Sequence, residues 1–391
     1  MLTANRLVIL PVLLVLFVFL APPALAAPKV VLDGRQLSFD VPPVIDQGRV
    51  LVPMRTIFEA LGANIEWDGY TRTVTAAKGQ TTISLTAGSR LVSFNGSPAL
   101  LDVPAKIMNG RTLVPLRFVS IAFDAEVLWT GGTQTVTITS AMEDIEVHFI
   151  DVGQGDAVYI SLPNNNDILI DGGDDTHISA VVNYLEDEFV DDIELLIATH
   201  PHEDHIGGLD DVLAAFKVET VADNGMAVDT AAYRDYRAAV KAENCNYERA
   251  DGQTWTYDRA EFSVIGPVKS YPGINDNSVV TLLKYGGVQI LFTGDMETAE
   301  ESDILSKLED VDVLKVGYHG GATGTSQAFL ETVRPETAII SVGAGNRYGH
   351  PAASTLQRLS DAGALVHRTD LDGAVVILAD GKVYYVVCEE G

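Results

Sequence analysis

A chain of 391 residues in which 47% are hydrophobic is long enough for two or three domains, each with its own core. The net charge of −28 is uneven. Residues 1–140 hold 11 of the 26 Lys and Arg and 9 of the 54 Asp and Glu, so the remainder, with 15 and 45, carries −30. No basic run follows residue 144, which argues against a long groove that grips duplex nucleic acid; most of the acidity serves solubility.

The first residues form a targeting segment. Arg6 precedes an apolar stretch over residues 7–20, which Pro22 and Pro23 end, and small residues follow up to Ala26. These fourteen residues fall short of the ~20 that a membrane helix needs. We therefore expect a signal peptide over residues 1–26, cleaved near Ala26, and a secreted or cell-surface protein; the alternative is an uncleaved N-terminal membrane anchor.

An internal repeat follows the targeting segment. Residues 48–55 reappear as residues 110–117, and the offset of 62 continues without a gap through Trp67 and Trp129. Each copy reads as a strand, a short helix (55–61 and 117–123) and a hairpin around the Trp, packed in a small sheet. A period above 60 indicates a domain duplication.

The repeated region, residues 29–140, resembles the N-terminal domain of copper amine oxidases, which serves as a stalk in bacterial surface proteins. The resemblance implies a small α+β stalk domain that attaches the protein to the cell wall or surface. All eight histidines lie at or after His148, and both cysteines at or after Cys245, so we expect no copper there. We expect a non-catalytic spacer or binding module.

Cys245 and Cys388 are the two cysteines of the chain. One bridge between them and two separate buried thiols are both compatible with an exported protein of this size. Neither has a metal-type spacing, and we assign them no catalytic role.

The most informative segment follows an apolar strand over residues 193–198. It places His200, His202, Asp204 and His205 within six positions. Imidazole nitrogens and carboxylate oxygens are the ligands that zinc or manganese prefers. The alternative is a polar loop that happens to be rich in histidine, but the spacing directly after a strand favours a metal site.

Three further ligand-type residues each close an apolar run that reads as a buried strand: Asp171 after 168–170, Asp295 after 290–293, and His319 after 313–316. Together with the histidine motif they resemble the metallo-β-lactamase superfamily. Residues 148–157 resemble the opening hairpin of the hydrolase domain in ComEC-type DNA-uptake proteins, and residues 275–278 and 347–351 resemble two further blocks of that subfamily. The resemblance covers residues 144–391.

The resemblance implies an α/β fold for residues 144–391, a four-layer αββα sandwich with the metals at strand ends. Strands expected at 261–265, 279–283 and 288–292 alternate with helices at 231–242 and 297–308, which suits two sheets faced by helices.

The resemblance also implies two divalent ions, zinc first and manganese as the alternative, that activate a water. His200 and His202 would hold one ion, and Asp204, His205 and His319 the other, with Asp295 between them. Asp171 would orient a ligand; otherwise it is a strand-end turn residue.

The sequence departs from the family pattern at two points. No histidine lies between His205 and His319, so the His200/His202 ion would need an oxygen ligand, from Asp276, Asn277 or water, and would bind more weakly or be a harder ion. Tyr318 stands where the subfamily has a first histidine.

Several pocket residues follow from the same blocks. His350 is expected to bind or protonate the leaving oxygen, unless it is a surface residue, and Tyr318 to donate to a phosphoryl oxygen, unless it only packs over the metal loop. The remaining candidates are Asp151, Gln154 and Asp156 at the pocket rim, although Gly153 and Gly155 alone would explain a tight hairpin there, and Asn275, Asp276 and Ser278 around the pocket. His148, His177 and His367 match no motif, and we expect structural or exposed positions.

Three functions remain open. The first is a secreted or cell-surface metal-dependent phosphodiesterase or nuclease related to the ComEC-type hydrolase domain. The second is a hydrolase of another wall-linked ester or amide, such as a phosphoester or a lactam. The third is a non-catalytic surface protein with a structural metal, which the open ligand set argues against. The chain lacks the apolar segments of a DNA channel.

Overall fold

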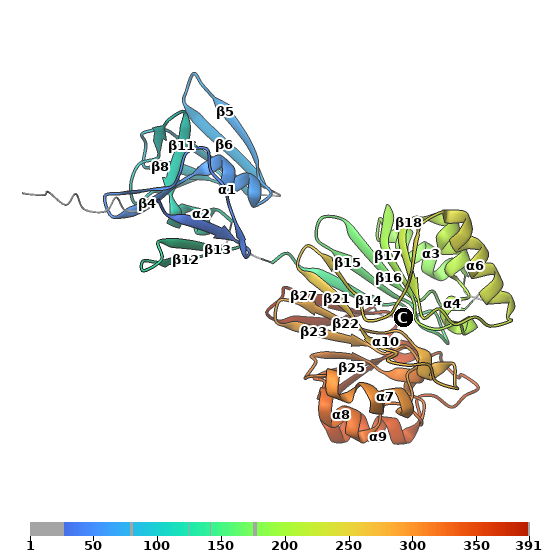
Figure 1. The fold of residues 1–391 in the computed structure, drawn as a ribbon. Coiled ribbons are helices and arrows are strands. Elements are labelled where there is room, and N and C mark those ends of the chain that lie inside the picture. The colour runs from blue at the N-terminus through green and yellow to red at the C-terminus, as the bar shows by residue number, and fades with distance from the viewer. Residues whose placement is uncertain (1–26, 79–80, 124, 141, 175–177, 390–391) are drawn as a thin grey trace, which may run out of the picture. The chain divides into compact units, whose positions relative to one another are not determined.

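The computed structural model describes residues 27–78, 81–123, 125–140, 142–174 and 178–389 (Figure 1). The expected signal peptide, residues 1–26, and His177 lie outside these ranges. The chain divides into two compact units between Ala141 and Met142, and each is described by itself. Within the described ranges, no helix has both the length and the apolar character to cross a membrane.

The first unit is mostly β-structure. Its strands are β1 (Lys29–Leu32), β2 (Arg35–Gln36), β3 (Val44–Asp46), β4 (Arg49–Pro53), β5 (Asn64–Asp68), β6 (Thr73–Lys78), β7 (Thr81–Thr86), β8 (Leu91–Phe94), β9 (Ser97–Leu100), β10 (Lys106–Met108), β11 (Arg111–Pro115), β12 (Glu126–Thr130) and β13 (Thr135–Thr139), and its helices are α1 (Met54–Ala60) and α2 (Leu116–Phe123). Both helices begin one residue earlier than expected, because a proline (Pro53 or Pro115) ends each preceding strand and supplies a φ suited to a helix start.

The two copies of the repeat form one domain around a shared core. Strand β4 pairs antiparallel with β11, and Val52 lies opposite its own counterpart, Val114. The Trp hairpins form as expected, with Trp67 opposite Val74 and Trp129 opposite Val136. The described strands of the unit are divided among several small sheets. Hairpin β5–β6 continues into β7–β9, whereas β13 pairs in parallel with β1, so the unit contains three sheets.

The second unit contains two large sheets. The strands are β14 (Ile145–Phe149), β15 (Val158–Leu162), β16 (Asn166–Ile170), β17 (Asp192–Ala198), β18 (Lys217–Asp223), β19 (Asn246–Arg249), β20 (Thr254–Tyr257), β21 (Ala260–Gly266), β22 (Val280–Tyr285), β23 (Val288–Phe292), β24 (Val313–Lys315), β25 (Thr337–Ile340), β26 (Leu365–Arg368), β27 (Val375–Ala379) and β28 (Tyr384–Cys388). The first sheet has the order β19-β18-β17-β16-β15-β14-β27-β28, and the second β20-β21-β22-β23-β24-β25-β26.

The second unit also contains helices, the longer of which cover the outer faces of the two sheets. They are α3 (Ile178–Asp187), α4 (Glu203–Ile206), α5 (Leu209–Ala215), α6 (Ala231–Glu243), α7 (Thr298–Ile304), α8 (Gln327–Val333), α9 (Ala353–Ala362) and α10 (Thr369–Asp372), with short 3-10 turns η2 (Asn275–Asn277), η3 (Leu305–Lys307) and η4 (Gly317–Gly320). The helix expected over 297–308 is shorter: α7 ends at Ile304, and a 3-10 turn replaces its last turn.

Three buried clusters define the layers of the second unit. One cluster joins the inner faces of both sheets and includes Phe149 and Phe292, whose rings lie 6.1 Å apart. A second packs the first sheet against α3, α5 and α6, and a third packs the second sheet against α7, α8 and α9. Figure 1 shows α3 and α6 on one outer side and α7, α8 and α9 on the other. The unit is therefore the expected four-layer αββα sandwich.

Both cysteines are free in the structure. Cys245 is half-buried, and Cys388 is exposed. Neither a disulfide nor the alternative of two buried thiols is found.

Candidate metal centre and active site

The expected ligands gather where strands of both sheets end. Strands β16 and β17 are parallel neighbours, so Asp171 and His200 follow them at the same edge. Strands β23 and β24 are likewise parallel and lead to Asp295 and His319. Asp171 and His319 have positive φ, 60° and 49°, a conformation that is strained for these residues and that clusters at functional sites.

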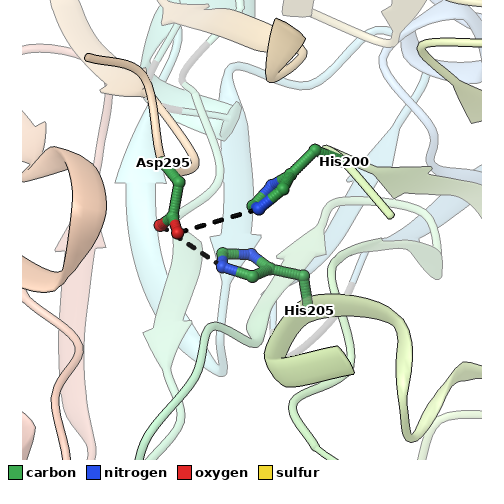
Figure 2. Close-up of side chains that lie close together, drawn as sticks. All are labelled: His200, His205 and Asp295. Carbon is green, nitrogen blue, oxygen red and sulfur yellow. Dashed lines mark ion pairs between the residues drawn. The ribbon is translucent and has the colours of Figure 1, made fainter. Parts of the chain in front are cut away.

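Asp295 is the common neighbour of three histidines. Figure 2 shows its carboxylate facing the rings of His200 and His205, with Oδ2 3.7 Å from His200 Nε2 and Oδ1 3.3 Å from His205 Nε2. His319 Nε2 lies 3.4 Å from the same Oδ1 and 3.3 Å from Oδ2 of Asp204. Candidate ligands therefore form two groups, His200 with His205 and Asp295, and Asp204 with His205 and His319. His205 belongs to both groups, and Asp295, a member of the first, also lies close to His319 of the second.

The buried atoms of these groups fit divalent cations. His205 Nε2, His319 Nε2 and Asp295 Oδ1 are buried and have no hydrogen-bond partner in the described part of the chain. A buried polar atom without a hydrogen-bond partner lowers the stability of the fold. Three such atoms that face one space are therefore best explained by a cation that binds all of them. Nitrogen and carboxylate donors suit zinc or a related transition ion.

His202 lies beside His200, with its Nδ1 2.9 Å from His200 Nε2. The oxygen ligand expected for this pair from Asp276 or Asn277 is not found. Asp276 accepts a hydrogen bond from the backbone N–H of Glu300, and the Asn277 side chain bonds Tyr271 within its own loop. Asn277 is engaged because its loop folds back on itself, and Asp276 because the start of α7 packs beside this loop.

Two ligand histidines are oriented by hydrogen bonds at Nδ1. Asp171 Oδ2 lies 2.7 Å from His205 Nδ1, and the backbone carbonyl of Ser341 lies 3.0 Å from His319 Nδ1. Asp171 also accepts from the N–H and the hydroxyl of Thr199, both at 2.7 Å. Because Nδ1–H donates outward, Nε2 is the nitrogen that each ring presents to a cation at the centre.

We had expected Asp156 at the pocket rim, and this expectation was wrong. The residue is buried beneath the ligands, with Oδ2 2.6 Å from Lys315 Nζ and Oδ1 3.2 Å from His319 Nδ1. It lies there because its backbone N–H donates to the carbonyl of Asp204, which draws the hairpin under the histidine loop. Lys315, which we had not expected at the site, is a buried charged residue on the otherwise apolar β24 and needs such a partner.

In the metal-free chain, His205 and His319 carry the positive charge that balances the buried carboxylates. Burial lowers the pKa of His200 well below its usual range. Burial acts in the same direction on His319, but the carboxylates of Asp295 and Asp156 outweigh it and raise the pKa of His319 to about 10. Asp295 and Asp171 likewise overcome burial and raise the pKa of His205 well above its usual range. Protons thus occupy the positions that a cation would take.

A cavity of about 330 Å³ opens above the ligands. It is lined by the ligands His202, Asp204, Asp295 and His319 and by Gln154, Pro201, Glu203, Thr230, Asn275, Tyr318, Tyr348 and His350. The His350 ring lies 5.1 Å from that of Tyr318 and 5.8 Å from that of Tyr348. The structure therefore brings Tyr318 and His350 to the pocket, as expected. Tyr348 was overlooked, although it belongs to the same sequence block as His350.

The other expected pocket residues support the walls. Gln154 Oε1 accepts from the N–H of Gly343, and Ser278 Oγ accepts from the N–H of Asp295 beneath the floor. Asn275 lines the cavity and donates to Glu297. Asp151 does not reach the cavity, because its carboxylate accepts from the N–H of Gly153 and closes its own turn.

A four-layer αββα sandwich with histidine and aspartate ligands at its strand ends defines a metallo-β-lactamase-fold hydrolase. Residues 150–344 match the metallo-beta-lactamase superfamily, and residues 31–138 match the copper amine oxidase N-terminal domain. The chain therefore carries a metallo-β-lactamase domain in its second unit and a copper amine oxidase N-like domain in its first. A metallo-β-lactamase domain implies divalent-metal binding.

The relatives include competence proteins. The chain is 30% identical over 251 residues to ComE operon protein 3 of Bacillus subtilis and 32% identical over 237 residues to Recombination protein 2 of Haemophilus influenzae. Each match covers 59% of this chain but only 32% and 28% of the relative, so the chain spans about a third of the length of these proteins. Among solved structures, the metallo-beta-lactamase fold protein YhfI from Bacillus subtilis matches with a TM-score of 0.43 and 11% identity over 63% of this chain and 100% of that chain.

Proposed function

We propose that this protein is a secreted or cell-surface phosphodiesterase that cleaves single-stranded nucleic acid or small phosphodiesters. The observation that carries the proposal is the open cavity above orphaned ligand atoms. A structural metal site is a closed cage of protein ligands, whereas a catalytic site keeps a position open to substrate. Here His202, Asp204, Asp295 and His319 line the cavity, and the buried His205 contacts Asp295.

Zinc, or manganese as the alternative, would be held by His200, His202, Asp204, His205, Asp295 and His319. Bound ions would supply Lewis-acid polarisation of a phosphoryl oxygen and a water of lowered pKa. The protein's own contribution is to fix the ligand nitrogens through Asp171 and Ser341 and to keep the ligand atoms buried.

The pocket wall offers two groups to the substrate. Tyr318 carries a phenol whose pKa burial raises, so it keeps its proton and can donate to a phosphoryl oxygen. Burial and the neighbouring His319 lower the pKa of His350, which favours a neutral imidazole that binds the leaving oxygen. Both roles place the scissile bond between these rings and the ligands.

The competence relatives support a nucleic-acid substrate, while the charge of the second unit limits its form. With 45 acidic and 15 basic residues from residue 141 onward, a duplex backbone would meet repulsion outside the centre. A single strand or a short diester needs only the local positive charge of the ions, and its bases can stack on the exposed Tyr348.

We place the protein outside the cytoplasm on the strength of the apolar leader and the small residues before position 27. In this proposal the first unit, which has no histidine or cysteine, holds the enzyme at the cell wall or surface.

The proposal is tested with the purified chain on bis-p-nitrophenyl phosphate and on single-stranded DNA, with zinc or manganese. His202→Ala should abolish cleavage, whereas His367→Ala, a histidine on β26 outside the cavity, should leave it unchanged. Absence of cleavage of either substrate by metal-loaded protein would overturn the phosphodiesterase and favour an ester, an amide or a binding role. Cleavage of the small diester alone would exclude the nuclease.

A further inference from the structure

A second group of metal-type ligands lies outside the residues of the candidate centre. Glu146 and His148 are two apart on β14 and therefore lie on one face of the first sheet, and Glu188 follows α3, which covers that face. One ligand atom from each of these three side chains lies within 4.8 Å of the others. Glu146 Oε2 is 3.3 Å from His148 Nε2.

Neighbouring hydrogen bonds fix which nitrogen of His148 carries the proton. The hydroxyl of Tyr184 donates to Oε1 of Glu389 at 3.1 Å, so its oxygen is left to accept from His148 Nδ1 at 2.9 Å. Burial, and then the charge of Glu389, raise the pKa of Tyr184, so the phenol keeps its proton. His148 therefore bears its proton on Nδ1 and a lone pair on Nε2, the arrangement of a metal-binding histidine.

Nε2 of His148 lacks a hydrogen-bond partner anywhere in the described ranges. The residue is 3% exposed, and burial lowers its pKa to about 4, so the ring is neutral at pH 7 and forms no ion pair with Glu146. A buried lone pair then faces the carboxylates of Glu146 and Glu188 with no donor among them. Such a set of acceptors is unfavourable until a cation enters it.

We propose that Glu146, His148 and Glu188 bind a divalent transition-metal ion, zinc by ligand type, separate from the ions of the candidate centre. One imidazole nitrogen and two carboxylate oxygens suit zinc better than calcium or magnesium, which prefer oxygen alone. The ion joins β14 to the end of α3. Through Tyr184 and Glu389 it also supports the segment after β28. The proposal is independent of the reaction at the cavity.

The test adds zinc to the metal-free full chain and to the metal-free double variant Glu146→Gln/Glu188→Gln. Native mass spectrometry then counts the zinc ions bound to each. Both side chains are exposed, so the fold should persist. Glu186→Gln/Asp187→Asn, two exposed residues on the same helix, is the control with the same charge change. We expect the double variant to bind one zinc fewer, or to bind it at least about ten-fold more weakly, and the control to match the parent.

His148→Gln keeps a polar side chain but removes Nε2, and it should lose the same ion. Equal stoichiometry and affinity in the parent and in Glu146→Gln/Glu188→Gln would overturn the proposal, and so would an equal loss in the charge-matched control. If His148→Gln fails to fold, the pair of exposed substitutions still decides.

Discussion

Asp171 is the residue on which the orientation of the candidate centre most depends. It accepts hydrogen bonds from His205 Nδ1 and twice from Thr199. In Asp171→Asn the amide presents a donor where His205 also donates, so the ring must rotate or change tautomer. We expect zinc affinity to fall about 10–100-fold, as measured by competition with a chromogenic chelator.

The matched control for Asp171 is Asp167→Asn, on β16, the strand that leads to Asp171. Asp167 is also buried, but it accepts from the hydroxyl of Tyr159 and contacts none of the ligands. Its substitution should leave zinc affinity within about two-fold. Equal effects of the two substitutions would mean that Asp171 acts on general stability and not on His205.

Metal binding should release protons. In the metal-free chain nearby carboxylates raise the pKa of His205 and His319, so both rings are protonated at neutral pH. A cation must displace these protons, and its affinity therefore falls as the pH falls. Calorimetry at pH 7.5 in buffers of different ionisation enthalpy should show release of about two protons per chain. A binding heat that is independent of the buffer would contradict this.

The sequence could predict which side chains lie close together where a histidine or an aspartate comes directly after an apolar strand. His200, Asp295 and His319 could be selected this way because parallel strands bring their ends together. Asp156 and Lys315 could not, because their ion pair joins positions 159 apart and depends on how the two sheets pack. The third ligand expected from Asp276 or Asn277 was not found for a similar reason: Asp276 accepts from Glu300 on α7, and Asn277 bonds Tyr271 in its own loop.

At the scale of elements, the hairpin that follows β14 supports the histidine loop. Gly155 has φ +149°, and a Cβ there would overlap the carbonyl oxygen of Asp204, which already accepts from the N–H of Asp156. Gly155→Ala should therefore displace Asp204 from His319 and lower kcat/KM by about 100-fold or more.

Gly287→Ala is the control, because its Cβ would meet only the carbonyl of Gly381 at 3.5 Å, an ordinary contact. Steady-state kinetics on the small diester measures both variants. Normal activity in Gly155→Ala would show that the hairpin can shift without displacing Asp204, and would contradict this prediction.

The presence of most strands and helices could be predicted from the periodicity of apolar residues. The residues at which they end and the strands with which they pair could not. The end of the helix expected over 297–308 could not be predicted, because no glycine follows Ile304 to mark it. The two copies of the repeat were recognisable from their offset. The pairing of β1 with β13 could not be foreseen, since it joins strands about a hundred residues apart.

At the scale of the whole molecule, charge should separate this protein from proteins that grip duplex DNA. The −30 charge from residue 141 onward leaves few cations to neutralise phosphates. We expect weak binding of a 20-bp duplex by the His202→Ala variant, with a log–log salt slope of magnitude on the order of 2 or less. Fluorescence anisotropy at several salt concentrations measures it. A slope near 6–10 would indicate a backbone-binding groove and contradict the interpretation.

The closing strands of the first unit have a mechanical consequence. The chain enters the unit at β1 and leaves it at β13, and these strands are parallel, with Lys29 opposite Thr135 and Leu32 opposite Ile138. A pull between residues 29 and 139 would therefore act along both strands in opposite directions. The ladder hydrogen bonds would bear the load in shear and would have to break together instead of one after another, so the unit should resist tension along this axis.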